Sequence, residues 1–343
     1  MRSTLFRRAA KLLALAIPAL PGAAAAQACG DTLTGSVTLA ADLHCSTGWT
    51  AFDVGASGIT INLNGKTLSG TSALTDININ GADNVRIVGP GRIRGFWVGA
   101  NVFRSPKLIV DNIDFEDVGA GVMLNRSYMS TVRRSGFYRI ANSAVLIEDP
   151  LIGTSMDAGG NSIVDNDFGK VDIAVRTCGA TAGGNRIENN TIAAAYTAGI
   201  HLTDHSSGNY VAGNRMHNVY GAGIRVDASR GNTVVGNSIG RTAVGVELPA
   251  RRLGRCVADP GMGDDNGDHK VYDNRIVGSS AGFVVGNNPY DGKVFRVVFS
   301  GNVIDGASTG VLFDVNSLHN RVFGSTYIGV GTPVQDFGYD NIW

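Results

Sequence analysis

A small or polar residue followed by the pattern apolar, variable, apolar recurs along most of the chain. Because the apolar positions alternate, each copy predicts one short β-strand with a single buried face. Successive copies stand roughly 24 residues apart. The clearest eight are Gly121–Leu124, Ala144–Ile147, Asp172–Val175, Gly199–Leu202, Gly223–Val226, Gly245–Leu248, Gly282–Val285 and Gly310–Phe313.

Asparagine recurs with nearly the same period in two further series. One is Asn166, Asn190, Asn214, Asn237, Asn274, Asn302; the other, four or five residues earlier, is Asn161, Asn185, Asn209, Asn232. Strands this short bury little by themselves, so we expect the repeats to stack roughly 4.8 Å apart, each strand pairing with its copies above and below. An asparagine at a turn can then bond to its copy in the next coil and form a ladder. The repeat therefore predicts an all-β fold, a parallel β-helix.

The N-terminus has the pattern of a secretory signal peptide. A basic start is followed by the apolar run Leu12–Leu20 and an Ala-rich stretch with A-x-A cleavage choices after Ala26 or Ala28. The apolar run is too short to span a bilayer, and no later run is long enough, so we expect no membrane insertion. We predict a signal peptide over 1–28, a secreted or periplasmic location and one β-helix domain over 29–343, in which 29–70 form the N-terminal cap and first coils and 332–343 a C-terminal cap.

Four cysteines remain after the leader, and an even number in an exported protein favours disulfides. Of the three possible connectivities we predict Cys29–Cys45 with Cys178–Cys256, which closes one local and one longer loop. The 29 basic and 29 acidic residues balance, so there is no basic field for nucleic acid. The sequence leaves the oligomeric state open.

The first coils add a family resemblance. The segments Cys29–Thr32, Thr38–Cys45 and Ile61–Leu68, together with the repeat, resemble the right-handed parallel β-helix repeat proteins of the pectate-lyase-like superfamily, including its NosD-like group. The resemblance covers nearly the whole mature chain and implies a right-handed, single-stranded β-helix. That superfamily contains lyases, hydrolases, epimerases and non-catalytic proteins, so function has to be argued from a site.

Stacking turns the outward strand positions into columns of neighbours. The predicted central column is apolar at its ends and polar in the middle: Met123, Leu146, Ala174, His201, Arg225, Glu247, Val284, Leu312. A second column two residues further on is Asn125, Glu148, Arg176, Thr203, Asp227, Pro249, Gly286, Asp314. Polar residues on the middle coils alone indicate a site on that stretch of one face.

These residue types suit an acidic sugar. In uronate β-elimination, cations neutralise the carboxylate, a base removes the C5 proton and an acid protonates the leaving oxygen. We assign catalytic roles to His201 as base, Arg225, Glu247 and Tyr220. The residues predicted to bind the substrate are Arg176, Asp227, Glu148, Tyr196, Asp204 and His205. The predicted function is a polysaccharide lyase acting on a uronic-acid glycan.

Two other functions remain open. In a non-catalytic glycan-binding or surface scaffold protein, the outward charges would only form ladders of weakly interacting side chains along the stacked coils. An inverting glycoside hydrolase would use Asp227 and Glu247, whose carboxyls we expect roughly 8 Å apart. The histidines are scattered, without a Met or Cys cluster suited to copper.

One insertion interrupts the period. The step from Asn237 to Asn274 is 37 residues, which places an inserted loop at 249–268. A Cys178–Cys256 disulfide would hold this loop against the middle coils, and long loops on one face of a solenoid commonly carry binding residues. The loop's carboxylates make calcium the one cofactor to consider, with Asp264, Asp265 and Asp268 as its ligands.

Overall fold

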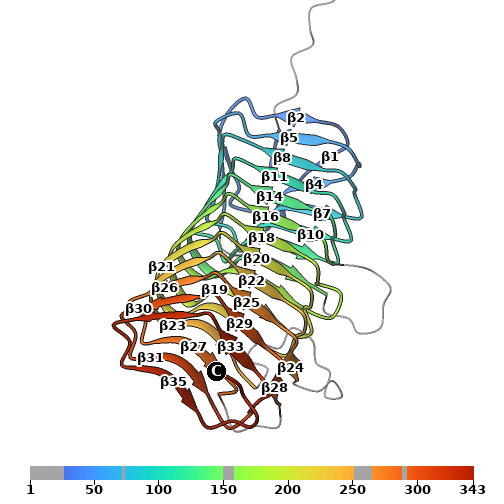
Figure 1. Ribbon diagram of the computed structural model, residues 1–343. Coiled ribbons are helices and arrows are strands. Elements are labelled where there is room, and N and C mark those ends of the chain that lie inside the picture. Colours follow the sequence, from blue (N-terminus) through green and yellow to red (C-terminus); the bar gives the residue numbers. More distant parts are fainter. Residues whose placement is uncertain (1–26, 72, 74, 150–157, 251–264, 288–291) are drawn as a thin grey trace, which may run out of the picture.

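The chain forms a solenoid of stacked β-strands, seen from the side in Figure 1. The computed structural model describes residues 27–71, 73, 75–149, 158–250, 265–287 and 292–343. All pairing between the described strands is parallel, and strands away from the two ends pair with their equivalents one coil earlier and one coil later. The predicted right-handed parallel β-helix is confirmed, and it has about twelve coils.

One wall of the solenoid is a twelve-stranded sheet with one short strand from each coil. Its strands are β2 (Val37–Thr38), β5 (Thr60–Asn62), β8 (Arg86–Val88), β11 (Ile109–Asp111), β14 (Thr131–Arg133), β16 (Ser162–Val164), β18 (Arg186–Glu188), β20 (Tyr210–Ala212), β22 (Thr233–Val235), β25 (Lys270–Tyr272), β29 (Val298–Ser300) and β33 (Arg321–Phe323).

The second sheet wraps around a corner, so each coil contributes a first leg and then a second leg. First legs are β3 (Leu43–His44), β6 (Thr67–Ser69), β9 (Arg92–Arg94), β12 (Asp114–Glu116), β26 (Arg275–Val277), β30 (Val303–Asp305) and β34 (Thr326–Ile328). Second legs are β1 (Asp31–Leu33), β4 (Thr50–Val54), β7 (Thr75–Asn80), β10 (Val98–Phe103), β13 (Ala120–Asn125), β27 (Ala281–Val285), β31 (Thr309–Phe313) and β35 (Thr332–Asp336).

In the middle coils the two legs are continuous. The long strands are β15 (Gly136–Glu148), β17 (Asp167–Cys178), β19 (Thr191–Thr203), β21 (Arg215–Val226) and β23 (Ser238–Leu248). A small third sheet joins β24 (Asn266–Gly267), β28 (Val294–Phe295) and β32 (Ser317–Leu318) near the C-terminal end.

The core consists of apolar columns that run along the stack. Phe115, Phe137 and Phe168 occupy one such column, with ring centroids 4.9 and 5.0 Å apart. These spacings are close to the strand separation, because register fixes the distance between identical side chains. All three rings are fully buried.

Both predicted asparagine series form buried ladders. Every copy before the last in each series donates its backbone N–H and its side-chain amide to the Oδ1 of the next copy, as from Asn190 to Asn214 at 3.0 Å. A second amide bond reaches a backbone carbonyl, as from Asn190 to Ile163 at 2.8 Å. The ladders thus satisfy buried turn groups that the strands leave unpaired.

The predicted register is wrong in one coil. Leu146 pairs with Arg176, and Arg176 pairs with His201, so Arg176 holds the place assigned to Ala174. The pairing shifts between Phe168 and Ile173, where the corner accommodates an irregularity. Because Ile173 and Val175 are both apolar, the sequence pattern fits either register. In the observed register Arg176 belongs to the first outward column and not to the second. The position predicted for Arg176 in the second column, between Glu148 and Thr203, is occupied by Cys178.

The two ends differ from the middle. The predicted disulfide Cys29–Cys45 is present. Cys178 is also disulfide-bonded, and its predicted partner Cys256 lies outside the described residues, as do most of the predicted loop and 1–26. The segment predicted as a C-terminal cap begins with β35, which pairs with β31, and bridges to the preceding coil at Tyr339 and Ile342.

Candidate functional site

Four ionisable side chains stand in one outward column of the second legs. Arg176, His201, Arg225 and Glu247 come from β17, β19, β21 and β23 and are register partners in that order. Leu146 precedes them and Val284 follows. We call these four residues the Arg176–Glu247 column. The structure therefore brings together four of the predicted residues, more closely than the sequence register implied.

His201 is held by a buried carboxylate. Its Nε2 lies 2.9 Å from Oδ2 of Asp227, which is fully buried, while His201 itself is only 3% exposed. A carboxylate accepts hydrogen bonds, so in the neutral imidazole it selects the tautomer protonated at Nε2. Nδ1 then carries the lone pair; it is buried and has no hydrogen-bond partner among the described residues.

Arg225 and Glu247 form a half-buried ion pair. The Nε of Arg225 donates to Oε2 of Glu247 at 2.7 Å, and Asn287 donates to Oε1 of the same carboxylate at 2.8 Å. Glu247 therefore orients the guanidinium and has both oxygens engaged. Arg225 still has its terminal nitrogens, because a guanidinium carries five N–H donors.

Glu148 lies beside the start of this column. Burial raises the pKa of its carboxyl, while a hydrogen bond from Asn125 (3.1 Å) and the charge of Arg176 act in the opposite direction. A carboxyl with a raised pKa can supply a proton at a higher pH than an ordinary one. The sequence named Glu148 only as a substrate-binding residue.

The predicted tyrosines lie elsewhere, on the corner between the legs. Tyr196 and Tyr220 stack on each other with ring centroids 5.5 Å apart and are 56% and 71% exposed. Within the described chain, no hydrogen bond joins either hydroxyl to His201 or Arg225. Asp204 and His205 form the turn after β19, both with positive φ; Asp204 is buried and His205 half-buried.

The calcium candidates do not gather in the part of the structure that is described. Asp265 lies 3.3 Å from Arg230, and Asp268 pairs with Arg296 at 2.6 Å; Asp264 lies outside the described residues. Across these same ranges, no three His, Cys, Asp or Glu side chains converge as a metal ion requires.

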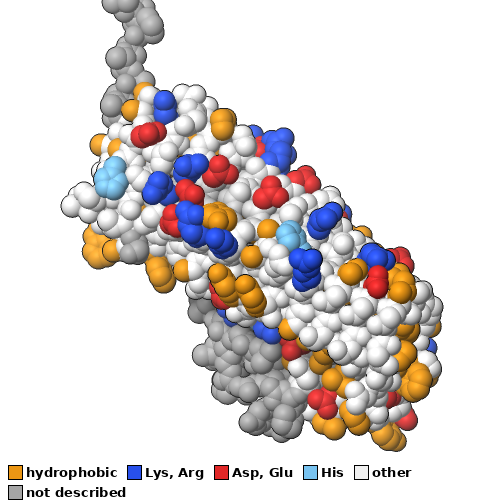
Figure 2. All heavy atoms as spheres, turned by 90° about the vertical axis from the view of Figure 1, so that its left-hand side faces the viewer, with side chains coloured by type: hydrophobic (Ala, Val, Ile, Leu, Met, Phe, Trp, Pro, Cys, Tyr) orange, Lys and Arg blue, Asp and Glu red, His pale blue; other side chains and the backbone are white. Residues whose placement is uncertain are grey.

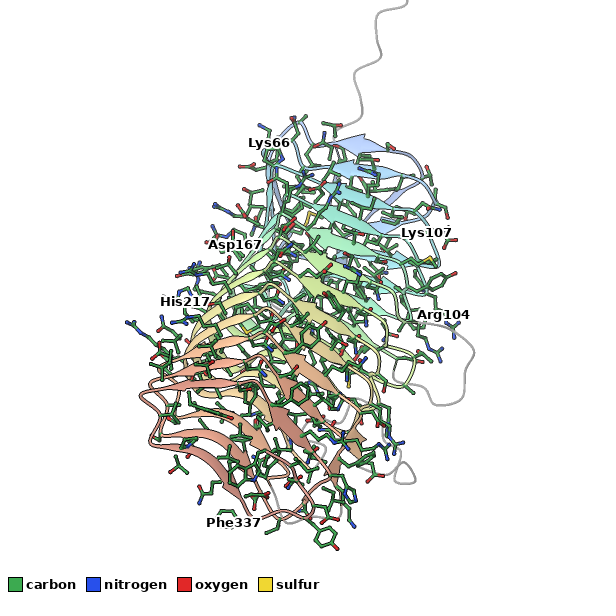
Figure 3. All side chains as sticks on the ribbon, viewed as in Figure 1. Lys66, Arg104, Lys107, Asp167, His217 and Phe337 are labelled. Atoms are coloured by element: carbon green, nitrogen blue, oxygen red, sulfur yellow. A yellow bond between two sulfur atoms is a disulfide. The ribbon has the colours of Figure 1, made fainter. Side chains whose placement is uncertain are left out.

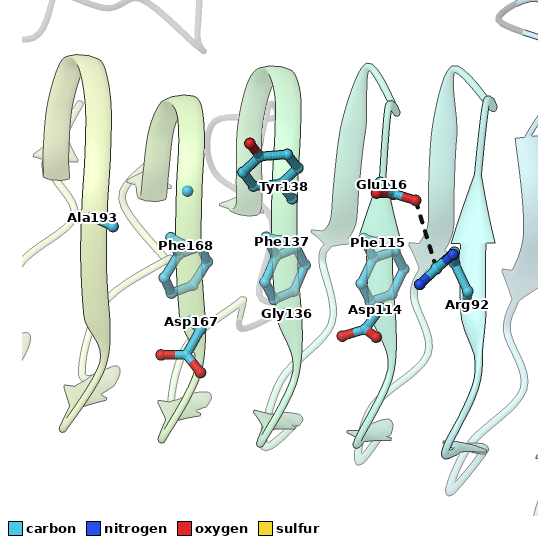
Figure 4. Close-up of a pocket in the computed structure, with 11 residues that line it drawn as sticks. Arg92, Asp114, Phe115, Glu116, Gly136, Phe137, Tyr138, Asp167, Phe168 and Ala193 are labelled. Carbon is cyan, nitrogen blue, oxygen red and sulfur yellow. Dashed lines mark ion pairs between the residues drawn. The ribbon is translucent and has the colours of Figure 1, made fainter. Parts of the chain in front are cut away.

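A groove on the outer face of the first legs was not predicted. Its volume is about 340 Å³, and its lining includes Asp114, Gly136, Tyr138, Asp167 and Gly169. Figure 4 shows Asp114, Gly136 and Asp167 at equivalent positions on three adjacent strands. The sequence does contain a sign of this groove, a glycine between two aspartates in one outward column. That column can be recognised only when the register of the first legs is known.

The fold and these columns place the chain among the parallel β-helix proteins. The sequence profile described as "Periplasmic copper-binding protein (NosD)" matches residues 55–239 and 99–278, so the chain belongs to the NosD family. The described residues do not fit a copper centre: the six histidines are dispersed, and His201 and His269 are bonded to Asp227 and Asn266. No curated protein sequence matches the chain significantly.

Solved structures share the fold at low identity. The tailspike protein of E. coli bacteriophage HK620, solved in complex with a pentasaccharide, is 13% identical with a TM-score of 0.58. The match covers 84% of this chain and 60% of the tailspike, so the chain spans less than two thirds of that protein's length. PfbA, a surface adhesin of Streptococcus pneumoniae, is 14% identical with a TM-score of 0.57, over 86% of this chain and 85% of PfbA. No helix among the described residues has the length and apolar character to cross a membrane.

Proposed function

We propose that this protein is an exported, periplasmic polysaccharide lyase that acts on a uronic-acid glycan at the Arg176–Glu247 column. The observation that carries the proposal is His201, oriented by Asp227 and flanked by an arginine on each neighbouring coil. The signal-peptide pattern and the family's periplasmic description support the location. The tailspike solved with a pentasaccharide supports a glycan as the ligand class.

The geometry supports the following roles in the proposed reaction. Arg176 and Arg225 bind the uronate carboxylate and stabilise the charge that develops when the C5 proton leaves. Nδ1 of His201 takes that proton, the C4–C5 double bond forms, and the C4–O bond breaks. Glu148 donates a proton to the departing oxygen, a role for which its raised pKa suits it better than the distant tyrosines. Asp227 and Glu247 position His201 and Arg225.

The test is incubation of the purified protein with a panel of uronic-acid polysaccharides, following the absorbance of the unsaturated product. We expect His201→Ala to lower the rate about 10² to 10⁴-fold, the usual contribution of a positioned base. The matched control is His217→Ala, a first-leg histidine on another face. No product from any polysaccharide, or equal rates in both variants, refutes the lyase.

A second candidate is a non-catalytic glycan-binding protein. It is favoured by the burial of His201, because a base that is 3% exposed is poorly placed to reach a substrate proton. This function predicts glycan binding without product, weakened by Arg225→Ala and unchanged by His201→Ala. The hydrolase has less support, since Asp227 is bonded to His201 and Glu247 to Arg225 and Asn287.

A further inference from the structure

The first-leg face carries a second, independent arrangement of polar groups. Basic and acidic side chains are interspersed over this face (Figure 2), and Asp167 and His217 project along its edge (Figure 3). Asp114, Gly136 and Asp167 are register partners in one column, and Glu116, Tyr138 and Gly169 in the adjacent one. We call the hollow between them the Gly136 groove.

Gly136 creates the hollow by having no side chain. A Cβ there would lie 2.6 Å from Oδ1 of Asp114, so that carboxylate leans over the glycine. Asp167 closes the opposite side, two coil spacings or roughly 10 Å from Asp114 between Cα atoms. A Cβ on Gly169 would lie 3.1 Å from the ring of Tyr138, so this ring covers the neighbouring backbone. Glycine backbone and an aromatic ring thus form an apolar floor between two carboxylates.

The charges of the groove are only partly neutralised. Glu116 pairs with Arg92 (3.5 Å) and with Arg139 (3.1 Å). Asp114 and Asp167 are exposed and have neither an ion pair nor a side-chain hydrogen bond within the described chain. Three carboxylates and one arginine line the groove, while Arg139 and Lys170 lie over the ring of Tyr138. Asp114 and Asp167 therefore offer two free acceptors, which favours a ligand that donates hydrogen bonds, and the excess of carboxylates in the lining repels a uronate.

We propose that the Gly136 groove binds an uncharged sugar ring of a glycan. Adjacent hydroxyl groups of the ring donate to Asp114 on one side and Asp167 on the other. Its C–H face packs on the Gly136 backbone and against Tyr138, which is 38% exposed. The volume of about 340 Å³ lies within the range of small-ligand sites. This site does not depend on the proposed lyase, because it lies on another leg and selects an uncharged sugar rather than an anionic one.

Filling the groove tests the proposal without damaging the fold. Gly136 lies in strand β15 without a positive φ, and a new side chain there meets only the far end of Asp114. Gly136→Val should therefore keep or raise the melting temperature, since β-branched residues favour strands. Ser238→Val is the matched control: it occupies the same column four coils further on, outside the groove.

The measurement is calorimetric titration of the full mature chain with neutral oligosaccharides and, separately, with uronate oligosaccharides. We expect a neutral oligosaccharide to bind the wild type and Ser238→Val equally, and at least tenfold more weakly to Gly136→Val and to Asp114→Ala/Asp167→Ala. His201→Ala should bind it normally, which separates this site from the lyase site. The proposal is overturned if no neutral oligosaccharide binds, or if Gly136→Val still binds it. It is also overturned if that variant loses uronate binding instead.

Discussion

Asn232 donates its backbone N–H to Nδ1 of His269 at 3.1 Å, so an imidazole takes the place that an asparagine carboxamide holds in the preceding coils. The other ring nitrogen lies 2.7 Å from Oδ1 of Asn266. Nδ1 must accept and Nε2 must donate, which requires the neutral imidazole. Burial, the largest cause, lowers the pKa of His269 to about 4, and the charge of Asp268 acts in the opposite direction.

This arrangement predicts a loss of stability in acid that depends on His269. An unfolded histidine titrates near pH 6.5, so between that pH and about 4 the unfolded state binds more protons than the folded state. The stabilising effect of the neutral ring is present above pH 6.5 and is lost as the pH falls. The loss amounts to roughly 3 kcal/mol at most.

We expect His269→Asn, which restores the asparagine of the ladder, to remove this loss. Chemical denaturation at pH 7 and at pH 4 should show a smaller decrease in unfolding free energy for the variant than for the wild type. His319→Asn is the control, because that ring is largely exposed. The same pH dependence in wild type and His269→Asn would contradict the assignment.

A ladder asparagine should be costly to remove. Asn190 is buried; its Oδ1 accepts from the backbone N–H of Asn166, and its amide donates to the carbonyl of Ile163. Asn190→Ala leaves both backbone groups buried and unpaired, at about 1–3 kcal/mol each. We expect a total loss of about 2–6 kcal/mol in unfolding free energy, measured by denaturant titration. The exposed Asn142→Ala should change it by less than about 0.5 kcal/mol.

Periodicity made the fold and the ladders predictable. Asparagine can repeat every 24 residues at a buried position only if each copy finds the same partner, so the two series indicated stacking directly. His269 escaped the prediction because the insertion after Asn237 breaks the count at that coil. The period identifies equivalent positions, whereas an exception within a column has to be seen in the structure.

The candidate site was predictable only in part. His201, Arg225 and Glu247 were placed in one column because their coils have regular spacing. Arg176 was misplaced by two residues, since the corner of β17 is irregular and its flanking apolar residues fit two registers. Tyr196 and Tyr220 were expected nearby from their short sequence distance, but the corner sets them in a stacked pair of their own. The alternation of apolar and polar residues does not show where a strand bends.

If the protein is the proposed lyase, its pH–rate profile should contain a limb, a fall in rate with rising pH, that depends on Glu148. A general acid must be protonated, and burial raises the pKa of this carboxyl above its usual 4.5. The rate of product formation should therefore fall as the pH rises through that raised pKa. Glu148→Gln should lower the rate and abolish this limb, while Glu188→Gln on the other sheet should leave both unchanged. An unchanged pH–rate profile in Glu148→Gln would exclude it as the acid.

We expect the replacement of Asp76 to strengthen the fold. Its carboxyl is fully buried, neither oxygen has a hydrogen-bond partner among the described residues, and burial raises its pKa well above 3.8. By register it stands between Ala51 and Gly99 in adjacent coils, where the neighbouring strands have small residues. Asp76→Ala should therefore stabilise the protein by about 1–3 kcal/mol at neutral pH, the usual cost of an unpaired buried polar group.

The pH dependence separates this effect from better packing. Because the folded pKa is raised, the wild-type carboxyl contributes most favourably below the unfolded pKa, and stability falls as the pH rises toward the folded value. The advantage of Asp76→Ala should thus grow between pH 4 and pH 7 in thermal or denaturant unfolding. Asp53→Ala should have the opposite sign, because Asp53 accepts hydrogen bonds from Thr50 and Asn78. A wild type more stable than Asp76→Ala at pH 7 would show that this carboxyl has a partner in solution.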